Sequence, residues 1–324
     1  MKYKKIIVSA FGDPDVLRMV EEELMAPPPG YVLVKVHAAG VARADSTRRS
    51  SDWSGQIPPF SLGYDFSGTV EALGEGVTSF DIGQRVAGIN ENLDSYSEYV
   101  LVKPEWMVAI AENVDLAQAA CLGLNYLVAY QCLHRLARVR SGDRILVLGA
   151  AGGVGSALVE LGILADLDVY GTAATTKTNL ISELGATPID YQRQDLQEFT
   201  KELSFNSVDD GIFDTYFKTA YKSLMPNGKY IVFGFLSSPQ DFASMSKKIE
   251  NVNLAGTENR EVINYGVIEP YDEDLSTLAG LLAAGKINPI VHERIPLQEA
   301  SRAHQLLESG EVAGKIVLIC NEDR

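Results

Sequence analysis

The sequence has few of the residues that build metal centres and disulfide frameworks. Its 324 residues include three cysteines and four histidines. Cys121, Cys132 and Cys320 are odd in number and far apart, which is typical of small buried side chains in a reducing compartment. The histidines form no His-x-x-x-His pair, so we expect each of them to pack or to lie on the surface. This usage predicts a cytoplasmic protein without a metal site.

Basic charge and long apolar runs are also scarce. Lys and Arg number 28 against 43 Asp and Glu, which gives a net charge of −15. This excess disfavours nucleic acid and anionic membranes as partners. We see no apolar run of membrane-spanning length, and Met1–Lys5 leads directly into a strand, not into a signal core. At 46% hydrophobic residues the chain is long enough for two domains with cores.

Residues 145–162 are the most informative stretch. Ile145–Leu148 predicts a buried strand, small residues follow, and Val154–Leu161 continues at helical spacing. Strand, glycine turn and helix form the first βα unit of a dinucleotide-binding fold, whose helix N-terminus binds phosphate. An ordinary tight turn without a nucleotide is the alternative, and Ala150 replaces the first glycine of the usual fingerprint. The predicted pyrophosphate contacts are Gly149, Ala150, Ala151, Gly152, Gly153, Val154 and Gly155, with Gly155 also allowing close helix–strand packing.

The next predicted strand, Leu167–Ala173, indicates which dinucleotide binds. NAD-binding chains place Asp or Glu at its end to accept from the ribose 2′-hydroxyl. Here residues 171–177 read Gly-Thr-Ala-Ala-Thr-Thr-Lys, with no carboxylate. Thr172 and Thr175 can donate to a 2′-phosphate and Lys177 can pair with it, although a solvated helix start would also carry such a lysine. NADP(H) is therefore the predicted cofactor.

The distribution of strand and helix signals along the chain predicts two domains. The first third is rich in short strands broken by Pro and Gly, and helical spacing takes over from Leu116. Strands and helices then alternate to about Phe235, which is typical of a doubly wound parallel sheet. We predict an α/β fold with a β-rich domain of residues 1–118 and 267–324 and a Rossmann domain of residues 119–266. The predicted strands cover 5–10, 31–38, 68–73, 85–89, 97–102, 145–148, 167–173, 188–190, 211–213, 230–234, 293–295 and 315–319.

Further motifs occur in the same order as in a known family. They are Phe11–Leu17, Val36–Asp45, Gly63–Gly68, Gly185-Ala186 with Ile189-Asp190-Tyr191, and Ala313–Leu318. With residues 145–162 they resemble the zinc-independent quinone oxidoreductase branch of the medium-chain dehydrogenase/reductase superfamily. Asn125–Tyr130 and Gly171–Lys177 look most like its vesicle amine transport protein group. The resemblance implies a chaperonin-10-like β domain, a Rossmann domain, a cleft between them, NADPH, a homodimer, and a quinone or enone as substrate.

The resemblance also allows the metal prediction to be tested on single residues. Ala42, Tyr64 and Leu124 stand where alcohol dehydrogenases of the superfamily hold catalytic zinc, and none of them can bind it. Tyr64 is the candidate donor to a developing oxyanion or the proton source, and a buried tyrosine bonded to the backbone is the alternative. Asp45 matches the aspartate of the Gly-Val-Asn-x-x-Asp motif and is expected to orient its neighbours.

Other candidate contacts also follow from the resemblance. Asn125 is expected beside the nicotinamide, with Tyr126 and Trp53 lining the substrate site, although Trp53 is equally suited to be a packing anchor. Tyr191 is expected at the adenine or the 2′-phosphate. Gly234 and Phe235, at the end of the predicted strand 230–234, complete the candidate cofactor contacts.

Two departures from the family pattern leave alternatives open. Ala42 replaces the asparagine of the motif, and residues 210–216 lack a glycine pair found in the family. The leading interpretation is metal-free hydride transfer from NADPH to a quinone or an α,β-unsaturated carbonyl. Enoyl thioester reduction, and nucleotide binding with little turnover, are the alternatives.

Overall fold

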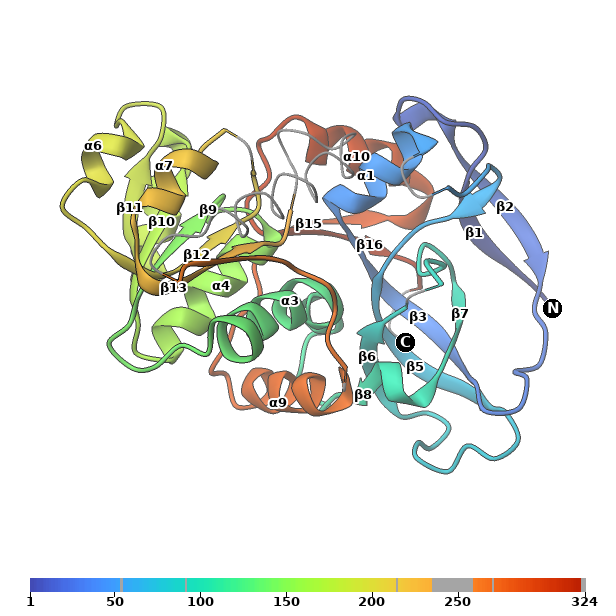
Figure 1. Cartoon of the computed structure of the whole chain (residues 1–324). Coiled ribbons are helices and arrows are strands. Elements are labelled where there is room, and N and C mark those ends of the chain that lie inside the picture. The colour runs from blue at the N-terminus through green and yellow to red at the C-terminus, as the bar shows by residue number, and fades with distance from the viewer. Residues whose placement is uncertain (53–54, 91, 214, 235–258, 270, 322–324) are drawn as a thin grey trace. The chain divides into compact units, whose positions relative to one another are not determined.

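The computed structural model describes residues 1–52, 55–90, 92–213, 215–234, 259–269 and 271–321 (Figure 1). The chain forms two compact units. The first consists of Met1–Leu127 and Glu269–Arg324, and the second of Val128–Ile268.

The first unit is built on a largely antiparallel sheet with the order β15-β16-β3-β5-β6-β8, in which β7 also pairs with β3. The C-terminal strand β16 pairs with β3, so the end of the chain returns to its first third. A smaller sheet has the order β2-β1-β4. The strands are β1 (Lys2–Val8), β2 (Leu17–Glu23), β3 (Val32–Val41), β4 (Phe60–Ser61), β5 (Asp65–Leu73), β6 (Arg85–Ile89), β7 (Tyr99–Val102), β8 (Met107–Ala109), β15 (Val291–Pro296) and β16 (Lys315–Ile319).

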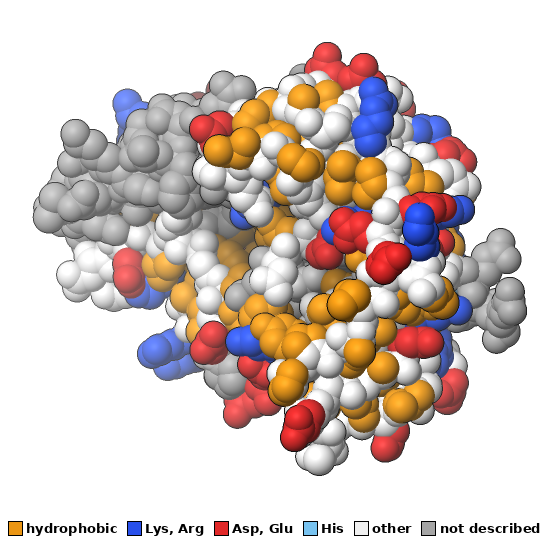
Figure 2. All heavy atoms as spheres, turned by 90° about the vertical axis from the view of Figure 1, so that its right-hand side faces the viewer, with side chains coloured by type: hydrophobic (Ala, Val, Ile, Leu, Met, Phe, Trp, Pro, Cys, Tyr) orange, Lys and Arg blue, Asp and Glu red, His pale blue; other side chains and the backbone are white. Residues whose placement is uncertain are grey.

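Helices complete this unit. Among its described residues, the α- and π-helices are α1 (Arg43–Ser50), α2 (Leu116–Ala119), the π-helix η4 (Leu122–Tyr126), α9 (Tyr271–Ala283) and α10 (Ala300–Glu308). The core is aliphatic, and Phe66 and Tyr96 are its largest fully buried side chains. On the face drawn in Figure 2, acidic and basic side chains are interspersed among apolar ones.

The second unit contains a parallel sheet with the order β11-β10-β9-β12-β13-β14. Its strands are β9 (Arg144–Leu148), β10 (Asp168–Ala173), β11 (Thr187–Asp190), β12 (Phe205–Asp210), β13 (Leu224–Val232) and β14 (Glu261–Asn264). Among its described residues, the α- and π-helices are α3 (Leu127–Tyr130), the π-helix η5 (Gln131–Ala137), α4 (Gly153–Leu164), α5 (Thr178–Glu183), α6 (Leu196–Thr200) and α7 (Phe217–Lys222). This order, with the first strand at the centre, confirms the predicted doubly wound sheet.

One predicted strand is wrong. Residues 211–213 follow the strand Phe205–Asp210 and form a turn. The carboxylate of Asp210 accepts from the backbone N–H groups of Ile212 (2.8 Å) and Phe213 (2.9 Å), and Phe213 has a φ of 51°. These two N–H groups are thus bonded to a side chain and not to a neighbouring strand, as a β-strand would require.

A second expectation also fails. Leu116–Ala137 is a 22-residue segment of helix interrupted by a turn at Ala120 and Cys121 and, among the described residues, is apolar enough to pass for a membrane span by length and composition. We did not expect any segment to meet those criteria. However, 83% of its most apolar window is buried inside the protein, as in a core helix.

Candidate functional site

The turn after β9 has the geometry that a phosphate-binding turn requires. Gly149 has a φ of +82°, which favours glycine. A Cβ on Gly155 would lie 2.2 Å from the carbonyl oxygen of Gly149, so only glycine lets α4 approach this closely. Gly152 is more open, and it precedes α4 without a side-chain cap. The first N–H groups of α4 are thus left for an anion.

Thr172, near the end of β10, holds this turn through two hydrogen bonds. Its Oγ1 accepts from the N–H of Gly149 (3.0 Å), and its carbonyl oxygen accepts from the N–H of Ala150 (3.0 Å). The residue is 2% exposed. Thr172 therefore holds the glycine turn in place, and its hydroxyl does not lie on the surface where a 2′-phosphate would.

Thr175 lies beside a carboxylate that the sequence did not lead us to expect there. Its Oγ1 donates to Oδ2 of Asp190 (2.7 Å), at the end of β11, and its N–H donates to Oε1 of Gln192 (3.0 Å). Nε of Arg193 lies 3.8 Å from the same Asp190 oxygen. The Thr175 proton is thus committed to Asp190, whose charge is partly offset by an exposed guanidinium.

The remaining predicted cofactor contacts of this unit lie on the strand ends or just after them. Lys177 ends the short 3-10 turn after β10, and Tyr191, 43% exposed, follows β11. Gly234 follows β13, whereas Phe235 lies outside the described residues. Since the carboxyl ends of parallel strands share one edge of a sheet, these residues and the glycine turn belong to the same edge.

In the first unit, Tyr64 lies immediately before β5 and is paired with a residue that sequence reasoning missed. Its hydroxyl oxygen accepts from Nε of Arg48 (2.8 Å), whose guanidinium carbon is 5.6 Å from the centre of the Tyr64 ring. Burial, and then the charge of Asp45, raises the pKa of Tyr64, while Arg48 opposes the rise. The phenol is therefore neutral near pH 7, with its proton still available to donate.

Asp45 is completely buried and holds the backbone on both sides of this site. It accepts from the N–H of Ala42 (2.9 Å), the N–H of Gly63 (3.1 Å) and the hydroxyl of Tyr96 (3.1 Å). Burial raises the pKa of its carboxyl to about 6. These contacts tie the start of α1 to the residue that precedes Tyr64.

The Asp45 contacts continue into a buried chain of hydrogen bonds. Nε2 of His304 lies 3.2 Å from the Tyr96 oxygen, and its Nδ1 lies 3.4 Å from Oγ of Ser46. Burial, and then Arg49 and Arg43, lowers the pKa of His304 to about 3, so its ring is neutral. Because Tyr96 donates to Asp45, we assign the ring proton to Nε2, with Ser46 donating to Nδ1.

A buried ion pair lies at the start of β5 and β16. Nζ of Lys315 is 2.9 Å from Oδ2 of Asp65, and their side chains are 3% and 0% exposed. The same ammonium donates to Oδ1 of Asn125 (3.3 Å) in the π-helix η4. A Cβ on Gly40 would lie 2.3 Å from Cε of Lys315, so glycine at this position makes room for the pair.

The other predicted substrate contacts are less informative. Tyr126 follows Asn125 in η4 and is 3% exposed. Trp53 lies outside the described residues.

The residues at the zinc positions offer no metal ligands. Ala42 and Leu124 have aliphatic side chains, and Tyr64 is held as a neutral phenol. Across the described part of the chain, no group of three or more His, Cys, Asp or Glu side chains is placed to hold a metal ion. Cys121, Cys132 and Cys320 are buried free thiols.

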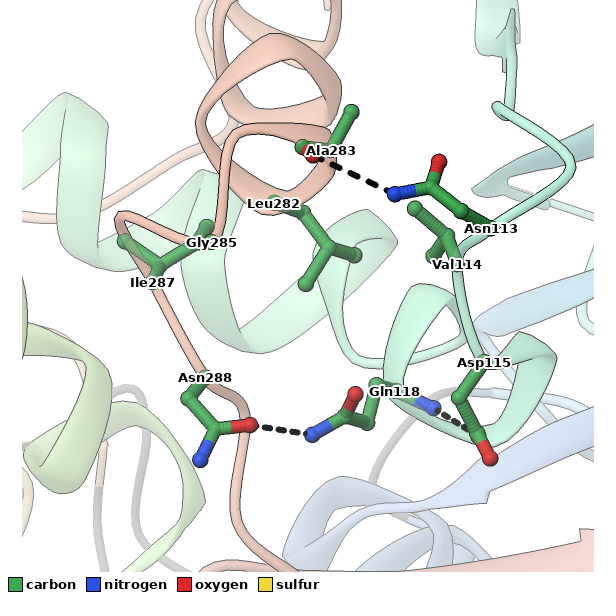
Figure 3. A pocket seen from close by; sticks show the side chains of 9 residues that line it. All are labelled: Asn113, Val114, Asp115, Gln118, Leu282, Ala283, Gly285, Ile287 and Asn288. Atoms are coloured by element: carbon green, nitrogen blue, oxygen red, sulfur yellow. Dashed lines mark hydrogen bonds between the residues drawn. The ribbon is translucent and has the colours of Figure 1, made fainter.

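A pocket elsewhere in the first unit contains none of the predicted site residues (Figure 3). Its amides bond to neighbouring groups: Nε2 of Gln118 donates to Oδ1 of Asn288 (2.6 Å), and Nδ2 of Asn113 donates to the carbonyl oxygen of Ala283 (3.5 Å). These contacts fasten α2 and the preceding loop to the end of α9 and the segment after it. We infer that these contacts stabilise the fold and do not form a ligand site.

Comparison with known proteins identifies the family. The family model described as alcohol dehydrogenase GroES-like domain matches residues 28–112, and the one described as zinc-binding dehydrogenase matches residues 184–318. The structure of a quinone oxidoreductase from Pseudomonas syringae is 30% identical, with a TM-score of 0.88, and the match covers 98% of this chain and 99% of that one. This chain belongs to the quinone oxidoreductase-like medium-chain dehydrogenases/reductases. The predicted resemblance and the chaperonin-10-like part of the predicted fold are thereby confirmed.

Other proteins are also similar to this chain. Rat quinone oxidoreductase is 28% identical over 98% of this chain and 97% of its own length. A zebrafish protein named synaptic vesicle membrane protein VAT-1 homolog is 27% identical over 98% of this chain and 70% of its own length. The structure of Escherichia coli quinone oxidoreductase complexed with NADPH has a TM-score of 0.89 at 25% identity and covers 98% of this chain and 99% of that one.

Proposed function

We propose that this chain is an NADPH-dependent, metal-free reductase of quinones or α,β-unsaturated carbonyl compounds. The observation that carries the proposal is the turn between β9 and α4, where a positive-φ Gly149 and the tight contact at Gly155 leave the start of α4 open. The NADPH complex of the Escherichia coli relative supports the same choice of cofactor.

The glycine turn fits the pyrophosphate of the dinucleotide. Backbone N–H groups at the start of α4 bind the phosphates, and Thr172 keeps the turn rigid through Gly149. Lys177 pairs with the 2′-phosphate and Tyr191 contacts the adenosine end. Gly234, just after β13, packs against Gly211, where a Cβ would lie 2.8 Å from the Gly211 carbonyl oxygen, and its backbone contacts the cofactor. When bound, NADPH supplies a hydride to the electrophilic carbon of the substrate.

The first unit contributes hydrogen bonding to the substrate. Tyr64 donates its phenolic proton to the carbonyl oxygen on which negative charge develops. Arg48 stabilises the charge that Tyr64 acquires as it gives up this proton, because its Nε already bonds to the phenolic oxygen. Asp45 holds the backbone before Tyr64 through the N–H of Gly63 and is a positioning residue. Asn125 and Tyr126 line the same site.

A quinone or enone suits this arrangement better than an unactivated alcohol. Conjugation lets negative charge spread onto the oxygen without a Lewis acid, which is needed here because the residues at the zinc positions cannot bind a metal ion.

We also propose that the chain forms a homodimer in the cytoplasm. Light scattering after size-exclusion chromatography tests the dimer, and cell fractionation tests the location.

The decisive experiment follows NADPH oxidation at 340 nm with 1,4-naphthoquinone, a small enone or crotonyl-coenzyme A as acceptor. Turnover with the quinone or the enone supports the proposal. Preference for the thioester would replace it with enoyl thioester reduction. Tight NADPH binding without turnover on any acceptor would indicate a nucleotide-binding protein.

A further inference from the structure

The ion pair between Asp65 and Lys315 is buried to a degree that stability alone does not explain. Their side chains are 0% and 3% exposed, and the charged atoms lie 2.9 Å apart. Removing two charges from water costs free energy, and apolar residues of similar volume often serve a core as well or better. Gly40 nevertheless leaves room for the pair, because a Cβ at this position would lie 2.4 Å from Oδ1 of Asp65. The surrounding fold is therefore built to admit this pair.

The pair is joined to the π-helix η4 through Asn125. Nζ of Lys315, which lies 2.9 Å from Oδ2 of Asp65, also donates to Oδ1 of Asn125 (3.3 Å). The N–H of Tyr126 bonds to the carbonyl oxygen of Cys121 (3.2 Å), five residues earlier, which is the π-helical pattern. Such turns are frequent at functional sites. The ion pair thus contacts this turn through Lys315, whose position Asp65 fixes.

Lys315 fixes which way the Asn125 amide faces. An ammonium group has three donors and no acceptor, so the atom of the amide that faces it must be the oxygen. The NH₂ group must then diverge from Lys315. It makes no hydrogen bond to any residue that the structure describes, although Asn125 is only 5% exposed. The NH₂ group therefore keeps its donors for an acceptor that a bound molecule supplies.

We propose that Asp65 and Lys315 are positioning residues that hold the Asn125 amide so that its NH₂ group donates to a carbonyl oxygen of a bound molecule. This inference rests on the function proposed above, which offers two such oxygens. One belongs to the carboxamide of the nicotinamide, and the other to the quinone or enone. Both are uncharged acceptors suited to a neutral amide donor.

Two sets of variants test the proposal. Asn125→Asp keeps an oxygen for Lys315 and removes the NH₂ donor. The double variant Lys315→Met/Asp65→Asn removes the ion pair without leaving a buried charge, and it frees the Asn125 amide to rotate. Arg302→Met/Glu293→Gln, which removes an exposed ion pair of 2.8 Å in the same unit, is the matched control. Circular dichroism and thermal unfolding establish that each variant folds.

Calorimetry with NADPH and with its thionicotinamide analogue, together with kcat and KM for naphthoquinone, separates the two sources. If the Asn125 NH₂ group donates to the carboxamide of the cofactor, both site variants should raise the NADPH Kd about tenfold, which corresponds to the loss of one hydrogen bond. They should also bring the affinities for NADPH and the thio analogue closer together, because sulfur is a weak acceptor. A donor to the substrate predicts an unchanged NADPH Kd and an about tenfold lower kcat/KM.

The contrary results are equally distinct. If both site variants fold and leave Kd, the analogue ratio and kcat/KM within twofold of the parent, the inference is wrong while the proposed function stands. It is also wrong if Asn125→Asp has an effect and the double variant has none. If the double variant does not fold, Lys315→Met alone decides, because the unpaired buried Asp65 takes up a proton. If the parent chain shows no affinity for NADPH, the proposed function and this inference fail together.

Discussion

Nε of Arg48 lies 2.8 Å from the hydroxyl oxygen of Tyr64, which leaves the phenolic proton free to reach a substrate. If Tyr64 is the oxyanion donor, Tyr64→Phe should lower kcat for naphthoquinone about 100-fold, the usual effect of losing such a donor. The NADPH Kd should change little. Stopped-flow measurement of NADPH oxidation under single-turnover conditions checks the chemical step directly.

Arg48 should act through Tyr64. We expect Arg48→Met to lower kcat about tenfold, the loss of one charge-assisted hydrogen bond. Combined with Tyr64→Phe it should add almost nothing, because residues that act together are not additive. Arg18→Met, at an exposed arginine of the same unit, is the control. Additive losses would show that Arg48 acts independently of Tyr64.

Lys177 should discriminate between the two nicotinamide cofactors. Lys177→Ala is expected to weaken NADPH binding about tenfold or more and to leave NADH binding nearly unchanged, because only NADPH carries the 2′-phosphate. Fluorescence titration with both cofactors measures the ratio. Equal weakening of NADPH and NADH binding would show that Lys177 does not contact the 2′-phosphate.

Gly155 should be essential to the packing of α4 on β9. A Cβ there would lie 2.2 Å from a backbone oxygen, so Gly155→Ala should destabilise the fold by about 1–3 kcal/mol and weaken NADPH binding. Gly280→Ala is the matched control, because no atom lies within 4 Å of its Cβ position in α9. That change should stabilise the protein by about 0.5–1 kcal/mol. Chemical denaturation compares the two, and a neutral Gly155→Ala would contradict the packing argument.

Buried carboxylates should make stability fall as the pH rises. Burial raises the pKa of Asp45 to about 6 and that of Asp209 to about 7, above the ordinary value of 3.8. The native state therefore binds more protons than the unfolded state between about pH 4 and 7, and the free energy of unfolding falls across this window. Asp209→Asn should stabilise the protein at pH 8 by a few kcal/mol, of the order that this shift implies. The exposed Asp81→Asn makes the same change of charge, and an equal gain from it would show that burial of Asp209 is not the cause.

The local parts of this structure were predictable and the long-range ones were not. The strand, glycine turn and helix of residues 144–164 follow from neighbouring residues, since apolar β-branched side chains, small residues and helical spacing occur in sequence. By contrast, β12 ends in Asp209 and Asp210, which read as loop residues. Asp210 is stabilised there by the Tyr230 hydroxyl on β13, a partner 20 residues away.

The same limit applies to the candidate sites. Tyr64 and Asp45 could be singled out because they stand in recognisable motifs, whereas Arg48 has no such signal. Lys315 lies in the motif Ala313–Leu318, but its pairing with Asp65 spans 250 positions and arises only when β16 joins the sheet. Asp190 was missed beside Thr175 for a related reason, because Asp190 ends β11 and Thr175 lies in the turn that follows the neighbouring strand β10.

Cofactor binding at the glycine turn and metal-free turnover can be measured together, by calorimetric titration of the purified chain with NADPH followed by addition of naphthoquinone and the chelator EDTA. We predict saturable binding of one NADPH per chain, followed by oxidation of the cofactor at a rate that EDTA does not change. Absence of saturable NADPH binding would contradict the assignment of the glycine turn. Loss of turnover with EDTA would contradict a metal-free mechanism.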